Sequence, residues 1–247
     1  MSENRVHLSE RLQCLADMVP EGKRVVDVGC DHGFVSIYLV QSGISPHVLA
    51  MDVREGPLSR AKEHIQTYGL EQYIETRISD GLKAFTPGEA EVCICAGMGG
   101  RLMMSILRDS EEKAKQLDAL ILQPQSELPV FRQFLRKEGY IVTDENILLE
   151  DGKYYFVMQV ISGVYSRVAS EQTLDTEEER FYDNFSRILL EKRHPVMRRY
   201  LTEQRESVDK LMKHLKDEDG ERAASRLSEL SSERMSIDKA LNLMDKY

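Results

Sequence analysis

Short runs of β-branched and apolar residues alternate with helical stretches over residues 1–162. Seven of these runs have the length and composition of strands and are bounded by polar or glycine-containing turns. The predicted strands are Arg24–Val28, Val48–Asp52, Ile74–Ile78, Val92–Ala96, Ala119–Leu122, Tyr140–Leu148 and Tyr154–Ile161. The spacing of apolar positions between them predicts helices around Val35–Leu39, Leu58–Tyr68, Arg101–Leu107 and Leu128–Lys137. Strands that alternate with helices indicate a doubly wound α/β sheet in which most strands are parallel.

The connection between the last two predicted strands is different. The turn at Glu150–Lys153 is too short for a right-handed crossover but long enough for a hairpin. We therefore expect an antiparallel strand to end an otherwise parallel sheet of seven strands. This layout departs from the all-parallel dinucleotide-binding sheet and is typical of the Rossmann-like fold of class I methyltransferases.

Residues 163–247 lack the aromatic strand pattern and are predicted to be helical. Thr176 and Glu179 have the spacing of a capping box at the start of a helix. Further on, two segments repeat seam positions at spacings of three and four, as coiled coils do. The first seam is Met197, Leu201, Gln204, Val208, Leu211 and Leu215, and the second is Ala223, Leu227, Leu230, Arg234, Ile237 and Leu241. We therefore expect two domains, at 1–162 and 163–247.

A polar turn at 216–220 separates the two seams, so we expect the two helices to form an antiparallel coiled-coil hairpin. Matching the seams about Asp219 places Gln204 opposite Arg234, where an amide oxygen can accept a hydrogen bond from a guanidinium. The remaining layers are Leu215/Ala223, Leu211/Leu227, Val208/Leu230, Leu201/Ile237 and Met197/Leu241. A parallel dimer through the same seams is the alternative, and we favour the monomer.

The turn after the first predicted strand has features of a nucleotide-binding loop. Where a chain turns from a strand into a helix, backbone N–H groups and glycines let a ligand come close. A dinucleotide-binding fingerprint would need glycine at positions 29, 31 and 34, but Asp31 and Phe34 occupy two of these. The acid-x-Gly-x-Gly-x-Gly pattern of S-adenosylmethionine sites is met by Asp27, Gly29 and Gly33, with Asp31 in place of the central glycine. A tight turn that serves only packing is the alternative.

Acids and glycines also follow the next three predicted strands. Asp52 ends the second strand, where a carboxylate can accept hydrogen bonds from both ribose hydroxyls. Asp80 and Gly81 follow the third, where a carboxylate can accept from the exocyclic amine of adenine, and Gly97 after the fourth leaves room for a flat base or the sulfonium arm. Each acid could instead cap a helix, and each glycine could simply serve a turn. The predicted cofactor-binding residues are Asp27, Gly29, Cys30, Gly33, Asp52, Val53, Asp80, Gly81 and Gly97.

The balance of charge limits how the chain can bind nucleic acid. A formal net charge of -9 disfavours binding through bulk positive charge. Residues 1–174 hold 18 basic and 25 acidic side chains, whereas residues 175–247 hold 15 and 17. The densest basic cluster, which could contact phosphates, is Lys192, Arg193, Arg198 and Arg199, and a second candidate surface is formed by Arg132, Arg136 and Lys137. A solvated helix face balanced by neighbouring glutamates is the alternative.

The cysteines and histidines do not have the spacing of a metal site. Cys14, Cys30, Cys93 and Cys95 are predicted to be reduced thiols, and we expect no metal. No segment approaches the roughly 20 apolar residues of a membrane span, and Met1–Arg5 lacks the layout of a secretory signal. We therefore expect a cytoplasmic protein with no membrane partner.

Four motifs, taken in their order and spacing, resemble those of the bacterial TrmK family. They are Asp27–Gly33, Ala50–Leu58, Ala96–Gly100 and Leu122–Gln125, and the resemblance covers about residues 8–160. The predicted helical hairpin also fits this family. The resemblance implies S-adenosylmethionine as cofactor, tRNA as partner, and transfer of a methyl group to ring nitrogen 1 of the adenosine at position 22.

The chemistry of this acceptor favours positioning over proton removal. Ring nitrogen 1 carries an in-plane lone pair and no proton at neutral pH, so it can attack directly once it is placed. Methylation leaves the ring cationic, so a nearby carboxylate or histidine could stabilise the developing charge. Asp31 and His32, in the cofactor loop, are the predicted catalytic residues. Alternatively, Asp31 serves a left-handed backbone conformation and His32 is structural.

Further candidates for tRNA contact lie at two places. Arg101 follows the glycine-rich turn, and Tyr154 and Tyr155 open the last strand, where one of them could stack on a flipped base, or both could belong to the core. Two other functions stay open, a methyltransferase for a small molecule or protein and a non-catalytic RNA-binding protein that has kept the cofactor fold. The complete set of Asp27, Gly29, Gly33, Asp52 and Asp80 argues against the non-catalytic alternative.

Overall fold

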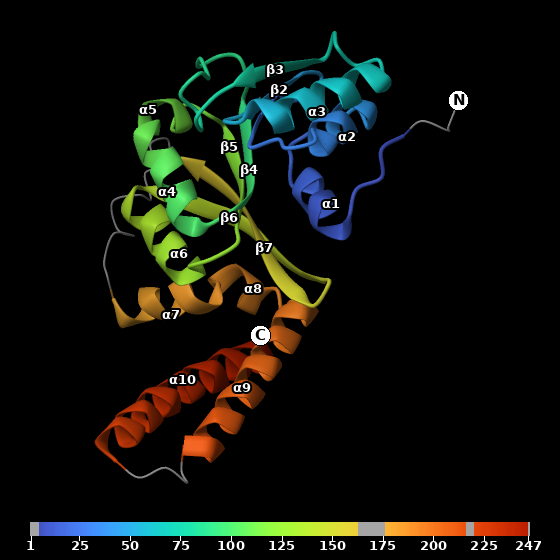
Figure 1. The fold of residues 1–247 in the computed structure, drawn as a ribbon. Coiled ribbons are helices and arrows are strands. Elements are labelled where there is room, and N and C mark those ends of the chain that lie inside the picture. Colours follow the sequence, from blue (N-terminus) through green and yellow to red (C-terminus); the bar gives the residue numbers. More distant parts are fainter. Residues whose placement is uncertain (1–4, 163–175, 216–219, 247) are drawn as a thin grey trace. The chain divides into compact units, whose positions relative to one another are not determined.

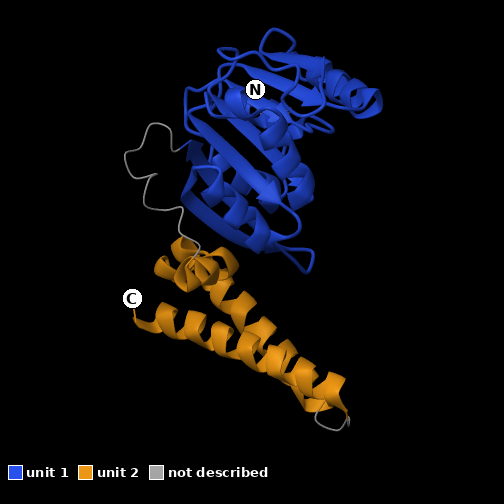
Figure 2. Ribbon diagram, turned by 90° about the vertical axis from the view of Figure 1, so that its left-hand side faces the viewer, with its two compact units in different colours: residues 1–175 blue, residues 176–247 orange. Residues whose placement is uncertain are grey.

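The computed structural model describes residues 5–162, 176–215 and 220–246. They divide into two units, Met1–Asp175 and Thr176–Tyr247 (Figure 2). The predicted boundary between 162 and 163 adjoins residues 163–175, which lie outside the described part of the chain. The division into 1–162 and 163–247 therefore stays a prediction.

All seven predicted strands belong to one sheet of unit 1 (Figure 1). Their order across the sheet is β3-β2-β1-β4-β5-β7-β6. The strands are β1 Val25–Val28, β2 Val48–Asp52, β3 Ile74–Ile78, β4 Val92–Met98, β5 Ala119–Pro124, β6 Tyr140–Glu150 and β7 Lys153–Ser162. The strand pairs among β1 to β5 are parallel, as the alternation with helices predicts.

The last strand in sequence is antiparallel, as predicted, but it does not lie at the edge of the sheet. β7 pairs antiparallel with both β5 and β6, so β6 is the edge strand. Asp151 and Gly152 connect β6 to β7 with φ values of 50° and 75°, as a two-residue hairpin turn with positive φ at both positions requires. Because β7 runs against its neighbours, it begins on the side of the sheet where β4, β5 and β6 end.

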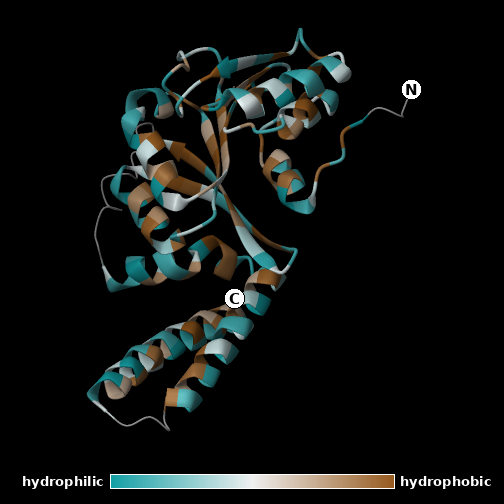
Figure 3. Ribbon diagram, in the orientation of Figure 1, coloured by the Kyte–Doolittle hydropathy of each residue, from teal (hydrophilic) through white to brown (hydrophobic). Residues whose placement is uncertain are grey.

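Buried apolar residues cover both faces of this sheet. One layer includes Met103 of α4 and Phe131 of α6, and the other includes Leu15 of α1 and Ile37 of α2. Figure 3 shows hydrophobic residues concentrated in the strands and on the inner sides of these helices. The helices of unit 1 are α1 Glu10–Asp17, α2 Phe34–Gln41, α3 Glu55–Thr67, α4 Gly100–Asp109, α5 Glu111–Ala114 and α6 Leu128–Lys137.

Helix α1 is absent from the sequence prediction. The Ser9 hydroxyl caps it by accepting a hydrogen bond from the Leu12 N–H at 3.5 Å, and Leu15 and Ala16 are fully buried. Its apolar residues have helical spacing, but α1 has only 8 residues, which is too short for a distinct periodic pattern. This helix places side chains on the sheet face that also carries α2 and α3.

Unit 2 is helical, as predicted. The Thr176 hydroxyl accepts a hydrogen bond from the Glu179 N–H at 3.1 Å, which confirms the predicted helix start. The two longest helices of the described residues pack together as an antiparallel hairpin (Figure 1). The helices of this unit are α7 Glu177–Phe185, α8 Arg187–Glu191, α9 Pro195–Leu215 and α10 Glu221–Lys246.

The hairpin seam differs from the prediction at its polar layer and at Leu211. Arg234 donates through Nε to the Asp209 carboxylate at 2.7 Å and also pairs with Asp238, so the predicted partner Gln204 is replaced by carboxylates. A charge-assisted hydrogen bond is stronger than one to an amide, and this position is only partly buried. Leu211 is 51% exposed, so its layer does not close.

The centre of the seam is buried as expected. Leu201, Val208, Leu230 and Ile237 are each 3% exposed or less. A parallel dimer, the alternative to the predicted hairpin, would need these same side chains, which the hairpin already covers. Within the described residues, no helix is long and apolar enough to cross a membrane, and α9 and α10 mix hydrophilic with hydrophobic residues along their length (Figure 3).

Candidate active site

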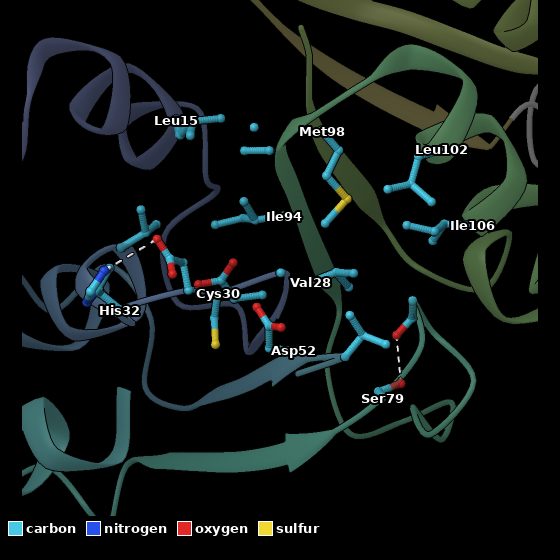
Figure 4. Close-up of a pocket in the computed structure, with 18 of the residues that line it drawn as sticks. Leu15, Val28, Cys30, His32, Asp52, Ser79, Ile94, Met98, Leu102 and Ile106 are labelled. Atoms are coloured by element: carbon cyan, nitrogen blue, oxygen red, sulfur yellow. Dashed lines mark hydrogen bonds and ion pairs between the residues drawn. The ribbon is translucent and has the colours of Figure 1, made fainter. Parts of the chain in front are cut away.

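The loops that follow β1, β2, β3 and β4 surround a cavity of about 670 Å³ (Figure 4). It lies at the carboxyl ends of the strands, where β1 is flanked by β2 on one side and by β4 on the other. Open α/β sheets bind their ligands at this reversal of strand order. The volume is in the range of small-molecule sites. The predicted cofactor-binding residues all line this cavity except Gly33, which lies in the same loop after β1.

The loop after β1 is a tight turn with positive φ at three of its positions. Gly29, Asp31 and Gly33 have φ values of 74°, 49° and 72°. A Cβ at Gly29 would overlap the Met98 side chain, and one at Gly33 would lie 3.2 Å from the Ala61 Cβ. Asp31 therefore holds the left-handed conformation of the glycine that it replaces, which confirms the conformational interpretation of this residue.

Asp27 is an almost fully buried acid at the base of the cavity. Its side chain accepts a hydrogen bond from the Ser36 hydroxyl at 2.7 Å, and the residue is 5% exposed. Burial raises the pKa of Asp27 to about 6, against the stabilising hydrogen bond from Ser36, and the Asp52 carboxylate raises it further. At neutral pH the carboxylate is ionised, and the described residues supply no cation to balance it. It is suited to a cationic group of a ligand.

One carboxylate oxygen of Asp52 accepts a hydrogen bond within the protein, and the other is available to a ligand. Its Oδ1 accepts a hydrogen bond from the Arg54 N–H at 2.9 Å, which fixes the turn before α3, but the N-cap of α3 is Arg54 and no side chain caps the helix. The described residues form no hydrogen bond to Oδ2. Because Asp52 is only 6% exposed and lines the cavity, Oδ2 is placed to accept from a ligand hydroxyl. Asp52 therefore does not cap the helix, and its role in the turn leaves one oxygen for a ligand.

The loop after β3 is closed by a residue that sequence reasoning missed. The Ser79 hydroxyl donates to the Gly81 carbonyl at 2.7 Å and accepts from the Ala84 N–H at 3.1 Å. Gly81 has a φ of 59°, and a Cβ there would lie 2.9 Å from the Ile106 side chain. Asp80 is exposed and pairs with Lys83.

The wall formed by the end of β4 and by α4 is apolar. Met98, Leu102 and Ile106 line it, on the right of the view in Figure 4. Leu102 and, across the cavity, Val53 are 53% and 59% exposed. Large apolar side chains left open to solvent around a cavity mark a binding surface for an apolar or aromatic group. Of these residues the sequence prediction contains only Val53.

Two more predicted residues are placed between these walls. Cys30 is 8% exposed, and burial raises the pKa of its thiol, with nearby aspartates adding to the shift, so the thiol is neutral. Gly97 has a φ of 75° and donates its N–H to the Gln123 side-chain oxygen at 3.2 Å. At both positions, a small or absent side chain lets the backbone lie close to the cavity.

The two predicted catalytic residues lie together at the rim. His32 Nε2 is 3.7 Å from an oxygen of Asp31, and Arg60 approaches the other Asp31 oxygen to 4.0 Å. The His32 ring is nearly parallel to that of Phe34, with the centroids 5.8 Å apart, and the His32 carbonyl lies 2.9 Å from His64 Nδ1. His32 is thus supported by a ring cluster while remaining 40% exposed at its side chain.

Among the aromatic candidates, Tyr155 rather than Tyr154 lies on the α1 face of the sheet. The Arg11 guanidinium carbon is 5.4 Å from the Tyr155 ring centroid. Successive strand residues face opposite sides, so Tyr154 shares the side of Phe156, over which Arg132 of α6 lies. Sequence reasoning missed Arg11 because it did not predict α1.

The predicted tRNA-contacting cations have partners within their own units. Arg101 donates to Glu127 at 2.6 Å and has a side chain that is 84% exposed. In unit 2, Arg198 pairs with Asp245 and Arg199 with Glu203, each at 2.8 Å. The neighbouring Lys192 and Arg193 lie in the turn between α8 and α9.

The class of the protein follows from the fold and from comparison with known families. Residues 8–158 match the methyltransferase domain family, and the chain belongs to it. It is 38% identical to the tRNA (adenine(22)-N(1))-methyltransferase of Bacillus subtilis over 160 residues, which are 65% of this chain and 67% of that protein. A putative tRNA methyltransferase of Mycoplasma pneumoniae is 30% identical over 155 residues, 62% of this chain and 71% of that protein.

Solved structures extend the likeness to nearly the whole chain. A putative tRNA (m1A22) methyltransferase from Streptococcus pneumoniae superposes with a TM-score of 0.83 at 29% identity, covering 95% of this chain and 100% of that one. The structure of B. subtilis TrmK gives a TM-score of 0.79 at 29% identity, with 96% and 99% covered. Within the methyltransferases, this chain therefore belongs to the TrmK family, as its motifs predict.

Proposed function

We propose that this chain transfers the methyl group of S-adenosylmethionine to ring nitrogen 1 of adenosine 22 of tRNA. The observation that carries the proposal is the cavity at the carboxyl ends of β1 to β4, lined by the acids and glycines of a nucleoside-binding loop in a TrmK-family chain. A streptococcal relative has been solved in complex with S-adenosyl-L-methionine, at 29% identity and a TM-score of 0.79.

The residues present fit this cofactor. Gly29 and Gly81 have positive φ values that favour glycine, and a Cβ at Gly81 would also press against Ile106, so both keep bare backbone beside the cavity. Asp52 offers a buried oxygen to a ribose hydroxyl, and Asp27 offers a buried negative charge to the cationic end of the molecule. Val53 and the apolar wall of Met98, Leu102 and Ile106 suit the adenine ring. The remaining predicted contacts are Cys30, Gly33, Asp80 and Gly97.

The chain has to place the acceptor more than it has to activate it. When bound, the cofactor supplies an electrophilic methyl group that the lone pair of ring nitrogen 1 can attack. Asp31 and His32 stand at the rim beside Cys30, where a carboxylate stabilises the positive charge that the adenine gains. His32, held by its ring cluster, orients the base.

One assay tests the function. The chain is incubated with labelled S-adenosylmethionine and unmodified tRNA, and the labelled nucleotide is mapped, with a tRNA carrying guanosine at position 22 as control. We expect label on adenosine 22 only, as 1-methyladenosine. Cofactor binding without label on the tRNA would instead favour a different acceptor, and absence of cofactor binding would favour a non-catalytic RNA-binding protein.

Replacing Asp31 with Asn tests its catalytic role. Asn tolerates the left-handed backbone, so this change removes the charge and keeps the conformation. We expect the rate of methyl transfer in a single turnover to fall by about tenfold or more, because one charge-stabilising contact is lost, while cofactor affinity measured by calorimetry stays unchanged. Lost cofactor binding would move Asp31 into the cofactor site.

The proposal also covers the residues that contact tRNA, the location of the protein, its oligomeric state and its independence of metal. We propose that Lys192, Arg193, Arg198, Arg199 and Arg101 contact phosphates of the tRNA, with Tyr154 a further candidate contact. We also propose that the protein acts in the cytoplasm as a monomer and without a metal. Among the described residues, no cluster of His, Cys, Asp and Glu is arranged to hold one. Sedimentation of the free chain and activity after dialysis against a chelator test the last two statements.

A further inference from the structure

The cavity has a side that the cofactor-binding residues leave open. Those residues come mainly from the loops after β1, β2 and β3. On the other side of β1, the wall is built by α1, by the end of β4 and by the segment after β5, and it includes Arg11 and Gln125, to which the proposed function gives no cofactor contact. An acceptor that meets the cofactor within this cavity has to lie against that wall.

Arg11 is held in place by three strands before any ligand binds. Its backbone N–H donates to Glu150 Oε1 at 3.0 Å, and its Nη1 donates to Gln123 Oε1 at 3.2 Å. Its guanidinium carbon lies 5.4 Å from the ring centroid of Tyr155. These partners come from the ends of β5 and β6 and the start of β7. A side chain fixed in this way loses little conformational freedom when it binds a ligand.

Gln123 is kept in the core at a cost to stability. It is 0% exposed, and its Nε2 has no hydrogen-bond partner in the described part of the chain. A buried, unmatched donor disfavours folding. Its Oε1, in contrast, accepts from both Arg11 and the Gly97 N–H at 3.2 Å. The amide therefore serves to hold the Arg11 side chain and the backbone at Gly97 in fixed positions beside the cavity.

Glu150 neutralises the positive charge of Arg11 beside the proposed acceptor position. A lone cation beside an acceptor that becomes cationic would oppose the reaction. The Glu150 carboxylate binds the Arg11 N–H and lies 3.9 Å from its Nε, and both side chains are only about one-fifth exposed, at 20% and 22%. The pair carries no net charge, so it presents a flat polar surface without adding a positive field.

We propose that Arg11 is a contact residue for the acceptor, and that the target adenine stacks on its clamped guanidinium. Gln123 and Glu150 are the positioning residues of this subsite, and Tyr155 supports the guanidinium. Unpaired RNA bases commonly stack on arginine planes and aromatic rings. This assignment rests on the proposed function and specifies which wall of the cavity receives the base.

The test compares three variants with a matched pair elsewhere in unit 1. The variants are Arg11→Leu, Arg11→Lys and Glu150→Gln. The controls are Arg24→Leu and Glu91→Gln, because Arg24 and Glu91 form a partly exposed ion pair of 2.6 Å next to the starts of β1 and β4, on the side of the sheet away from the cavity. For each protein, the thermal unfolding midpoint, cofactor affinity, tRNA affinity and single-turnover rate are measured.

A stacking surface predicts a specific set of results. Arg11→Leu should slow single-turnover transfer to tRNA by about 10- to 100-fold, the size of the loss of one stacked base. Arg11→Lys should not restore the rate, because an ammonium cannot provide the plane. Glu150→Gln should also slow transfer, because it exposes the Arg11 charge, without weakening tRNA binding. Cofactor affinity should stay within about twofold, as expected for surface changes outside that subsite, and both controls should keep the wild-type rate.

Other outcomes overturn the assignment. Full activity of Arg11→Lys, with tighter tRNA binding by Glu150→Gln, would make Arg11 a phosphate contact. For Arg11→Leu, a loss of cofactor affinity as large as the loss of rate would place Arg11 in the cofactor subsite. If Arg11→Leu is unfolded and Arg11→Lys is stable and fully active, Arg11 only tethers α1. A wild-type chain that leaves adenosine 22 unmethylated would refute the proposed function itself, whereas wild-type activity with an active Arg11→Leu refutes only this inference.

Discussion

Asp27 in β1 and Asp31 in the loop that follows it use the same side chain in opposite environments. Asp31 is exposed and occupies a left-handed backbone position that a residue other than glycine adopts at a cost of roughly 1 kcal/mol. Asp27 is buried against Ser36, and its charge is costly to the folded protein. Functional sites commonly retain such costs. The sequence pattern predicts both residues in the site, but only their environments separate a buried acid from one at the rim.

Asp27 makes stability and cofactor binding depend on pH in opposite ways. Its pKa of about 6 lies above the ordinary 3.8, so the folded chain holds this proton more tightly than the unfolded chain. The contribution of Asp27 to the free energy of unfolding therefore falls by about 3 kcal/mol in total as the pH rises from about 4 to 6. Asp27→Asn should unfold at a higher temperature than wild type at pH 8, with a smaller difference at pH 5.

The same variant should bind the cofactor less tightly. Loss of a buried charge that faces a cationic group should weaken binding by roughly tenfold or more at pH 8, and wild-type affinity should fall as pH drops below about 6. Calorimetry at both pH values measures this, with Ser36→Ala as the matched change on the partner. Equal affinities of wild type and Asp27→Asn at pH 8 would rule out the assigned role.

Among the helices and strands, short segments supply important residues of the site, whereas the long elements are the easiest to predict from the sequence. The strands and the two long helices have clear periodic patterns, and the structure confirms them. Helix α1 has 8 residues and supplies Arg11, Leu12 and Leu15 to the cavity, yet its pattern is too short to predict. The position of β7 between β5 and β6 also depends on pairing partners far away in sequence. That pairing brings Tyr155 beside α1.

The hairpin of α9 and α10 should depend on the centre of its seam and not on its open end. Leu230 is 1% exposed and Leu211 is 51% exposed, so the same substitution can be compared at both. Leu230→Ala should destabilise unit 2 by about 2 to 4 kcal/mol through lost burial and a cavity, and Leu211→Ala by less than about 1. Denaturant unfolding followed by the helical signal measures both, and equal losses would contradict the observed seam.

For the whole molecule, the net charge does not show which residues would bind RNA. The chain carries -9, so contacts with phosphate have to come from a few placed cations. The cluster in unit 2 is partly engaged, since Arg198 and Arg199 pair with Asp245 and Glu203. Such exposed pairs contribute little to stability, typically under about 1 kcal/mol, so phosphates can displace them.

Reversing the charges of Arg198 and Arg199 to Glu tests this cluster. We expect tRNA affinity to fall by at least about tenfold at low salt, and the slope of log affinity against log salt to become shallower by about one to two, because phosphate contacts are lost. Arg226→Glu is the matched control, since Arg226 is an exposed, paired arginine of α10. Unchanged binding by the double variant would exclude the cluster.

The sequence by itself determined the strands and the longer helices, the mixed sheet, the helical hairpin and the acids and glycines at the ends of β1 to β3. These depend on local periodicity and on residue types at strand ends, which a single chain displays directly. The tertiary structure decided which oxygen of Asp52 is available, which tyrosine lies beside α1, and that Arg11, Gln123 and Glu150 meet at one wall of the cavity. Residues 11, 123 and 150 are far apart along the chain, and only the packing of α1 against the ends of three strands brings their polar atoms within hydrogen-bonding distance.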